Sequence, residues 1–442
     1  MTNFEQLIPA HTLNLLASYR RIYVGFSGGL DSTVLLHYLQ AQSHVRDKLV
    51  AVHVHHGLQP AADSWLTHCK TICQDWGVVC QTFPLALSVT TNIESSARQA
   101  RYQTFASLIQ PHECFVTAHH QDDQAETLLL HLMRGTGIKG LSGIAACAPF
   151  HAGFMVRPLL DCSRAQLYAY ATQFGLVWVE DASNSNLQFS RNFIRHDIMP
   201  RLQQRWPAVC KTLARTADIS RSVQANLDDL AVIDCPMFAD DQAIFNILPL
   251  HTVYPLSVDR VHNVVRYWLQ RQAILPPSYA MMQIIVEELI HAKQDAKPCV
   301  WVDTQHCIRR YQDTLYVEQV QQEASGLVVV WDNFPEPCCL PNQGLLHAEP
   351  AAQGVRVESG DSLSIRFRQG GENFVWHQQT KSLKKLFQEW QIPPWLRNTI
   401  PLLFINNQLA MVVGYAISDS FFAKASNCFH VYDDCKKSTS LF

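Results

Sequence analysis

The stretch Arg21-Ile-Tyr-Val-Gly-Phe-Ser-Gly-Gly-Leu-Asp-Ser-Thr33 decides the fold of this chain. Residues 21–26 form a short apolar run, which predicts a β-strand, and residues 33–42 repeat apolar side chains with the period of a helix. Between them, two glycines let the backbone turn so that its N–H groups converge at the helix N-terminus, where the helix dipole favours anions. The stretch therefore predicts a strand–turn–helix unit that binds phosphate.

The turn lacks the Gly-Lys-Ser/Thr ending of a Walker loop, so another group must neutralise a bound phosphate. Asp31 is an odd neighbour for a bare phosphate but a natural ligand for a Mg²⁺ ion that bridges phosphates. The hydroxyl groups of Ser27, Ser32 and Thr33 can donate hydrogen bonds to phosphate oxygens. The alternative is a turn in which serine and aspartate only cap the helix.

Residues 1–200 continue this alternation of strands and helices. Strands are predicted at 49–55, 78–83 and 114–118, and helices at 65–76, 94–109 and 121–133. Such alternation predicts an α/β fold with a parallel sheet covered on both faces. Ligands of these sheets bind beyond the carboxyl ends of the strands, and the motifs below begin at such ends or lie downstream of the last one.

Histidines gather at or just beyond the carboxyl ends of two of these strands. They are His53, His55 and His56 in the first group, and His119 and His120, followed by Asp122, in the second. Imidazoles and carboxylates bind Zn²⁺, so these residues taken alone suggest a metallohydrolase. A structural role is the alternative for at least one histidine of the first group.

The helix predicted at 121–133 carries three acidic residues near its start. Asp122 and Glu126 lie four positions apart and Asp123 and Glu126 three, so each pair shares a helix face. Two carboxylates that face one cleft can hold Mg²⁺ or an ammonium group. The alternative is a helix start that resembles a capping box.

Two further stretches are candidates for contacts with phosphate. Residues 134–143 hold four of the chain's 18 glycines, which indicates a backbone that a ligand approaches closely or that moves, and we expect a loop over the cleft. Arg191 and Arg195 lie four positions apart and form a guanidinium pair suited to phosphates, with Asn184 and Asn192 holding the loop between them. A solvated surface is the alternative for the arginines.

The pattern changes beyond about residue 207. Helices are predicted at 256–271 and 278–293, a hairpin at 300–318, a linker at 331–350, and a mixture of strands with one basic helix, 380–391, at 353–432. We therefore expect three domains: a catalytic domain at 1–210, a mainly helical middle domain at 211–330 and a small α+β domain at 350–442.

The charge of the chain does not identify a partner. Its 35 basic and 38 acidic residues give a net charge of −3, which argues against bulk binding to polyanions but not against a local basic surface. Such a surface is predicted near the C-terminus, where cations alternate with aromatic residues: Arg366, Arg368, Trp376, Lys381, Lys384, Lys385, Phe387, Trp390 and Trp395. This composition suits RNA, and equally a small folded core with a solvated face.

Composition also bears on the compartment. The 14 cysteines include no Cys-x-x-Cys pair, which favours ordinary thiols in a reducing compartment. No apolar run approaches the length of a membrane span, and the first residues lack the layout of a signal peptide. We therefore expect a cytoplasmic protein without a membrane partner.

The motifs together resemble a known family. Ser27–Ser32 matches the SGGxDS loop of the N-type ATP pyrophosphatases, the PP-loop family. The wider set is similar to the tRNA(Ile)-lysidine synthetase family, and it comprises His53–Leu58, Ala118–Thr127, Arg134–Gly143, Arg157–Leu160, Glu180–Asn184 and Arg191–Arg195. The resemblance covers nearly the full length, and it is strong over residues 20–200, clear over 365–415 and weak in the helical middle.

The resemblance implies a PP-loop ATP pyrophosphatase domain and an enzyme that uses ATP and Mg²⁺. It implies ligation of free L-lysine to C2 of cytidine 34 in the CAU anticodon of tRNA(Ile), through an adenylated cytidine and with release of AMP and pyrophosphate. That product changes the codon from AUG to AUA and the identity of the tRNA from methionine to isoleucine. It further implies a C-terminal domain that contacts the tRNA, and it allows a homodimer.

The resemblance also implies roles for individual residues. The nucleotide would be bound by Ser27, Gly28, Gly29, Leu30, Asp31, Ser32, His53 and His55. Asp31 would be the carboxylate on the metal side. The other expected catalytic residues are Asp122, Asp123, Glu126, Arg191 and Arg195. Glu126 would act with Asp122 or Asp123, and the resemblance does not assign which of these carboxylates binds the metal ion and which recognises lysine. The arginines would contact ATP or tRNA phosphates.

Other classes of protein remain as alternatives. A tRNA cytidine thiolase shares the loop but needs paired cysteines, and a glutamine-dependent synthetase needs a glutaminase half with a nucleophile for which this chain offers no candidate. A zinc phosphodiesterase follows from the histidines alone. A non-catalytic RNA-binding protein would leave the Ser27–Ser32 turn without a role.

Overall fold

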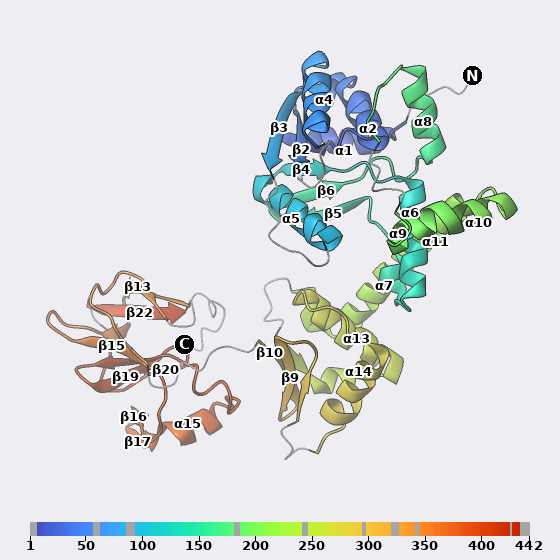
Figure 1. Ribbon diagram of the computed structural model, residues 1–442. Helices are drawn as coiled ribbons and strands as arrows, with labels where there is room; N and C mark the ends of the chain where they lie inside the picture. Colours follow the sequence, from blue (N-terminus) through green and yellow to red (C-terminus); the bar gives the residue numbers. More distant parts are fainter. Residues whose placement is uncertain are drawn as a thin grey trace. The chain divides into compact units, whose positions relative to one another are not determined.

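The computed structural model describes residues 7–55, 62–84, 93–180, 186–240, 246–293, 298–319, 327–340, 344–424 and 427–433 (Figure 1). The chain divides into two compact units, residues 1–230 and residues 231–442. Within the described ranges, no helix is both long enough and apolar enough to cross a membrane.

A six-stranded sheet forms the centre of the first unit, with the order β3-β2-β1-β4-β6-β5. Its strands are β1 (Arg21–Gly25), β2 (Leu49–His55), β3 (Val79–Pro84), β4 (Glu113–Val116), β5 (Cys147–Phe150) and β6 (Gly153–Val156). Neighbouring strands are parallel, except that β5 and β6 are antiparallel. The predicted parallel sheet is confirmed, and its antiparallel edge strand was not predicted.

The sheet has a core on each face because successive side chains of a strand point to opposite sides. In β1, Ile22 and Val24 belong to one core and Tyr23 to the other. Five helices contribute to the first core: α1 (Ala10–Ser18), α2 (Leu30–Gln40), α3 (Ser43–Arg46), α4 (Ala62–Asp75) and α8 (Arg164–Gln173). Helix α5 (Ile93–Leu108) contributes to the second. This arrangement directs the carboxyl ends of β1, β2 and β4 toward the predicted site residues.

The first unit also contains a group of helices, the last of which extends past residue 230. It contains α6 (Gln121–Met133), α7 (Ile138–Leu141), α9 (Ser190–Phe193), the π-helical turn η3 (Ile194–Ile198), α10 (Met199–Arg205) and α11 (Val209–Asp234). Ala125 of α6 packs with Ile194, Met199 and Cys210 in a small buried core. The run from α9 to α11 is therefore held against α6.

The first part of the second unit combines helices with a four-stranded antiparallel sheet. Helix α13 (Val258–Arg271) and α14 (Tyr279–Ile284), which continues as the π-helical η5 (Ile285–Ile290), share a core with the sheet around the fully buried Trp268. The sheet has the order β7 (Ile247–Pro249), β10 (Thr314–Gln319), β9 (His306–Tyr311), β8 (Cys299–Trp301). The predicted hairpin is confirmed as β9 and β10, with one strand added on each side.

The last part of the chain is rich in β-strands. One sheet contains β11 (Val328–Val330), β15 (Leu363–Arg366), β18 (Leu402–Ile405), β19 (Gln408–Val412) and β20 (Ala416–Ile417). The other contains β12 (Cys338–Cys339), β13 (Leu345–Ala351), β22 (Cys428–Asp433), β14 (Gly354–Arg356) and β21 (Phe422–Ala423). A separate hairpin, β16 (Asn373–Trp376) and β17 (Gln379–Ser382), precedes helix α15 (Leu383–Glu389).

The prediction of a linker at 331–350 is wrong. Trp331, Leu340 and Leu346 are buried in the core of the last part, and β13 pairs with β22 along its length. Of the residues that suggested a linker, Pro335 and Pro337 precede β12, Gly344 precedes β13 and Pro350 lies within β13, whereas Pro341 lies outside the described residues.

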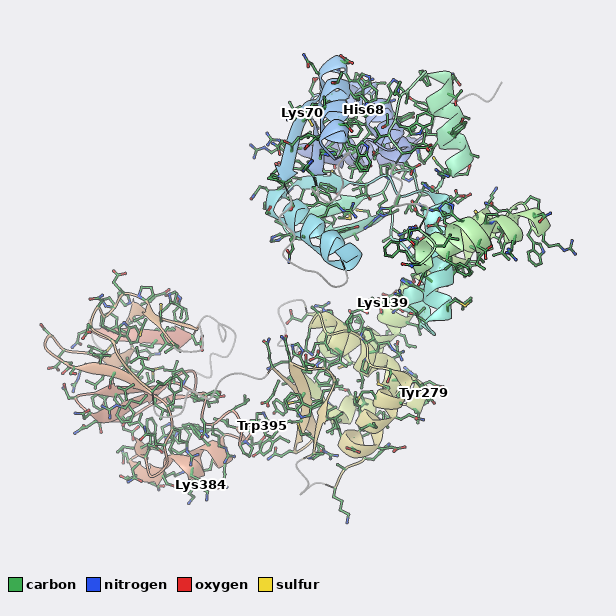
Figure 2. The ribbon with its side chains drawn as sticks, in the orientation of Figure 1. His68, Lys70, Lys139, Tyr279, Lys384 and Trp395 are labelled. Carbon is green, nitrogen blue, oxygen red and sulfur yellow. The ribbon has the colours of Figure 1, made fainter. Side chains whose placement is uncertain are left out.

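The predicted cluster of cations and aromatic residues divides between core and surface. Phe387 of α15 is fully buried, whereas Lys384 and Lys385 on the same helix are exposed. Figure 2 labels Lys384 on this helix. Trp390 stacks on Tyr415 with ring centroids 5.8 Å apart. Lys381 pairs with Glu389 at 2.8 Å. The aromatic residues therefore pack this part together, and the exposed Lys384 and Lys385 give it a basic face.

Candidate active site

The predicted phosphate-binding turn, Ser27–Ser32, joins β1 to α2. Ser27 Oγ and Ser32 Oγ lie 3.0 Å apart, and Ser32 Oγ donates a hydrogen bond to the carbonyl oxygen of Gly29 at 3.0 Å. The N–H of Gly29 donates to Ser27 Oγ at 3.3 Å. Gly28 has a φ of 82°, which lies in the left-handed region that favours glycine. The hydroxyl groups of Ser27 and Ser32 thus stabilise the turn, and its last three residues, Leu30–Ser32, already belong to α2.

The two glycines of the turn are expected to respond differently to alanine. A Cβ on Gly28 would lie 2.8 Å from Cys69 Sγ, which is fully buried, whereas the nearest atom to a Cβ on Gly29 is Ser27 Oγ at 3.5 Å. We expect Gly28→Ala to lower the free energy of unfolding by about 2–5 kcal/mol, from overpacking and a strained φ. Gly29→Ala should change it by less than about 1 kcal/mol. Denaturant unfolding of both variants tests this, and equal losses would contradict it.

His53 and His55 belong to the carboxyl end of β2, and His53 lies beside the turn. His53 is buried and its Nδ1 lies 2.9 Å from the carbonyl oxygen of Phe26, the residue before the turn. Burial lowers the pKa of His53, so a neutral ring supports the loop. His55 Nε2 lies 3.1 Å from the carboxylate of the exposed Asp63, and His56 lies outside the described residues. Among the side chains that the structure describes, no group of three or more His, Cys, Asp or Glu residues is arranged to hold a metal ion.

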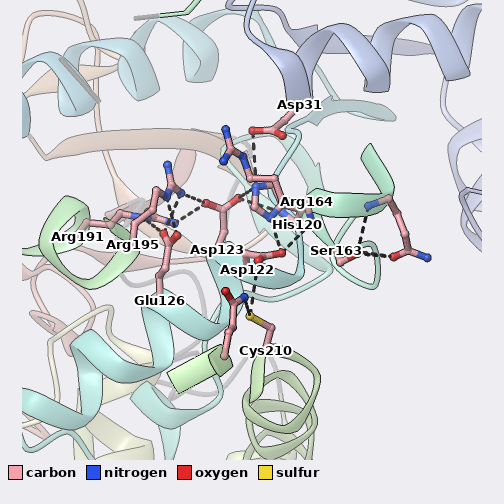
Figure 3. Close-up of polar contacts among 12 residues, drawn as sticks. Asp31, His120, Asp122, Asp123, Glu126, Ser163, Arg164, Arg191, Arg195 and Cys210 are labelled. Carbon is pink, nitrogen blue, oxygen red and sulfur yellow. Dashed lines mark hydrogen bonds and ion pairs between the residues drawn. The ribbon is translucent and has the colours of Figure 1, made fainter. Parts of the chain in front are cut away.

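Asp123 and Glu126 of α6 bind two arginines (Figure 3). Arg191 donates from Nε to Glu126 Oε2 and from Nη2 to Asp123 Oδ1, both at 2.9 Å. Arg195 donates from Nε to Glu126 Oε1 at 2.6 Å and from Nη2 to Asp123 Oδ1 at 2.8 Å. The carboxylate pair and the guanidinium pair, each expected from spacing, therefore meet one another.

This ion cluster lies largely out of solvent. The side chains of Asp123 and Glu126 are 11% and 3% exposed. Burial alone would raise the pKa of Asp123, but the charges of His120 and of the two arginines hold it at about 2. Burial alone would lower the pKa of Arg195. Its contacts with Glu126 and Asp123 outweigh this effect and raise the pKa. Asp123 and Arg195 are therefore charged at neutral pH.

His120 connects the phosphate turn to α6. Its ring is 1% exposed, and Nε2 lies 3.6 Å from Asp31 Oδ2 and 3.4 Å from Asp123 Oδ2. Burial would lower the pKa of His120, but Asp122, Asp31 and Asp123 outweigh it and raise the pKa to about 10. The sequence suggested His120 only as a metal ligand, although its place directly before the acidic helix start was a signal for this role.

Asp122 is directed away from the arginines. It accepts hydrogen bonds from the N–H of Arg164 at 2.8 Å and from Cys210 Sγ at 3.6 Å. Of the two carboxylates expected to act with Glu126, the structure therefore brings Asp123 to it. Asn192 donates to the carbonyl oxygen of Asn186 at 3.0 Å, and Asn184 lies outside the described residues.

The glycine-rich stretch 134–143 is fastened to α6 and α11. Gln124 exchanges two hydrogen bonds with the backbone of Ile144, at 3.0 and 2.6 Å. Arg221 of α11 donates to the carbonyl oxygens of Ser142 and Ile144 at 2.9 and 3.0 Å. Sequence reasoning included Gln124 only as part of the motif Ala118–Thr127, and it missed Arg221, since a single arginine within a long helix carries no local signal. The stretch is therefore tied to the helix that carries Asp123 and Glu126.

Family models match three regions of the chain. They are described as a PP-loop domain at residues 2–202, a TilS substrate binding domain at 248–316 and a TilS substrate C-terminal domain at 363–432. The first contains every predicted catalytic residue.

Relatives match over nearly the whole length. A tRNA(Ile)-lysidine synthase from Legionella pneumophila (strain Lens) is 42% identical over 409 residues, which cover 92% of this chain and 94% of the relative. One from Escherichia coli O157:H7 is 38% identical over 423 residues, with 94% and 97% coverage. A solved structure, the U34-tRNA thiolase NcsA from Methanococcus maripaludis, covers 46% of this chain and 73% of its own at 17% identity, with a TM-score of 0.39. By its full-length relatives and its domain models, the chain belongs to the tRNA(Ile)-lysidine synthase family.

Proposed function

We propose that this protein ligates free L-lysine to C2 of cytidine 34 in the CAU anticodon of tRNA(Ile), with consumption of ATP and release of AMP and pyrophosphate. The observation that carries the proposal is the juxtaposition of the Ser27–Ser32 turn, through His120, with the acidic residues of α6. Membership of the tRNA(Ile)-lysidine synthase family supports it.

The turn would bind the phosphates of ATP with its backbone N–H groups and the N-terminus of α2. Two polar atoms at the start of α2, Asp31 Oδ1 and Thr33 Oγ1, are buried without a hydrogen-bond partner in the described part of the chain. Asp31 therefore fits the role of a Mg²⁺ ligand, since Mg²⁺ commonly takes one or two carboxylates and completes its shell with phosphates and water. Bound there, Mg²⁺ would neutralise charge on the departing pyrophosphate.

Asp123 and Glu126 would act in the second step of the reaction, in which the amine of lysine displaces AMP. The C2 oxygen of cytidine is a poor leaving group, so it must first receive AMP, and the ε-amine of lysine must be deprotonated before it displaces that AMP. Asp123 and Glu126 already hold two cationic side chains, and we assign them to the cleft where the amine arrives. Arg191 and Arg195 would balance their charge and contact phosphates of ATP or tRNA.

The tRNA would extend beyond the catalytic unit. The exposed Lys384 and Lys385 of α15 offer cations for phosphates. Both lie inside the region that matches the TilS substrate C-terminal domain. We propose that this basic face contributes affinity for tRNA, while the first unit carries the chemistry.

The proposal is tested by incubating the protein with radiolabelled lysine, ATP, Mg²⁺ and unmodified tRNA(Ile) that carries a CAU anticodon. We expect label in acid-precipitable RNA that resists mild alkali, because an aminoacyl ester would be hydrolysed. A tRNA with cytidine 34 replaced by uridine is the matched control and should stay unlabelled. Release of AMP and pyrophosphate without labelled RNA would show that the protein cleaves ATP but would refute lysine as its substrate. Sulfur donors would then be tested on the same RNA.

A further inference from the structure

Asp122 makes contacts that differ from those of its neighbour Asp123, although both lie in the first turn of α6 (Figure 3). Its Oδ2 accepts a hydrogen bond at 2.8 Å from the N–H of Arg164, the first residue of α8. Its Oδ1 accepts a hydrogen bond at 3.6 Å from Sγ of Cys210, near the start of α11. One carboxylate therefore joins the N-termini of three helices, where negative charge is favourable.

Cys210 is held in the position that this contact requires. It is buried, and its Sγ accepts a hydrogen bond from Gln203 Nε2 at 3.2 Å. With that acceptor position occupied, the S–H is directed to Asp122. Because Cys210 also packs in the small core with Ala125 and Ile194, the contact fixes the helical run that carries Arg191 and Arg195.

Asp122 approaches the reactive groups only through His120. Its Oδ2 lies 3.6 Å from His120 Nδ1, while Nε2 of the same ring faces Asp31 and Asp123. His120 Nδ1 is buried without a hydrogen-bond partner among the described residues, so the carboxylate of Asp122 acts on the ring by charge, as an ion pair. The direction in which His120 faces the two carboxylates therefore depends on Asp122.

We propose that Asp122 is a positioning residue, which joins α6, α8 and α11, orients His120, and does not itself bind ATP, lysine or RNA. This inference rests on the proposed function, since it leaves the contacts with substrates to Asp31, Asp123 and Glu126. The inference assigns different roles to two adjacent aspartates, which the spacing of acidic residues along the helix did not distinguish.

The test compares four variants in steady-state lysidine formation and in thermal unfolding. Asp122→Asn keeps an oxygen for the N–H of Arg164 but removes the charge beside His120, and we expect kcat to fall by about 10- to 100-fold with unchanged KM for lysine and ATP. Cys210→Val should lower kcat, whereas Cys210→Ser, whose hydroxyl replaces the thiol donor, should retain it. The double variant Asp122→Asn/Cys210→Val should lose less than the product of the single losses, because both remove one contact.

Each of the other results overturns the inference. A raised KM for lysine or ATP with unchanged kcat would place Asp122 on a substrate. A lower melting temperature with unchanged kcat would make Asp122 merely structural. Losses of kcat that multiply in the double variant would show that Asp122 and Cys210 act independently. The control is Asp197→Asn, because Asp197 pairs with the exposed Arg201. A wild-type protein that forms no lysidine would refute the proposed function instead, and release of AMP by the same variants would then decide the role of Asp122.

Discussion

Replacement of Asp31 by asparagine is expected to abolish ATP cleavage while the protein stays folded. Asp31 Oδ1 is buried without a partner among the described residues, and Oδ2 faces His120 Nε2 at 3.6 Å. The amide of asparagine keeps the shape but carries no charge for a metal ion or for the imidazole. Because electrostatic stabilisation by a group of this kind supplies several kcal/mol, we expect the rate of pyrophosphate release to fall by about 1,000-fold or more.

Pyrophosphate release and thermal unfolding of wild type and Asp31→Asn provide the measurement. The matched control is Asp47→Asn, because Asp47 is an exposed aspartate before β2, at the opposite end of the strands. We expect the control to match wild type in both assays. Wild-type pyrophosphate release by Asp31→Asn would remove Asp31 from the metal side of the site.

The parts of the site that the sequence predicted are those encoded locally. The turn at Ser27–Ser32 needs only two glycines between a strand and a helix, and the spacing of Asp123 and Glu126 fixes a shared helix face wherever the helix lies. These features are present in the structure. Their meeting with Arg191 and Arg195 was not predicted, because it depends on the packing of α9 and η3 against α6.

The spacing of residues in the sequence could not distinguish the roles of Asp122 and Asp123. Both lie on a helix face with Glu126, and the sequence left them equivalent. The distinction comes from Arg164 and Cys210, which are remote in sequence and reach Asp122 only in the folded chain. The linker predicted at 331–350 failed for a similar reason, because the burial of Trp331 and Leu346 depends on strands much later in the chain.

Replacement of Glu126 by glutamine is expected to destabilise the first unit strongly. The Glu126 carboxylate accepts from Nε and Nη2 of Arg195 and from Nε of Arg191, and its side chain is 3% exposed. Without that charge, two guanidiniums would share the single carboxylate of Asp123. Removal of one partner from a buried ion pair costs about 3–5 kcal/mol, because the other charge remains buried. For a unit of this size we expect the melting temperature to fall on the order of 10 °C.

A second substitution separates this stabilising role from the proposed role in catalysis. Arg195→Gln in the Glu126→Gln background removes the unmatched charge, so the double variant should regain part of the lost stability. It should not regain lysidine formation, since neither the carboxylate for the amine nor the guanidinium returns. Asp197→Asn, which breaks an exposed pair with Arg201, should cost at most about 1 kcal/mol. Recovery of both stability and activity in the double variant would show that Glu126 only balances the charge of Arg195.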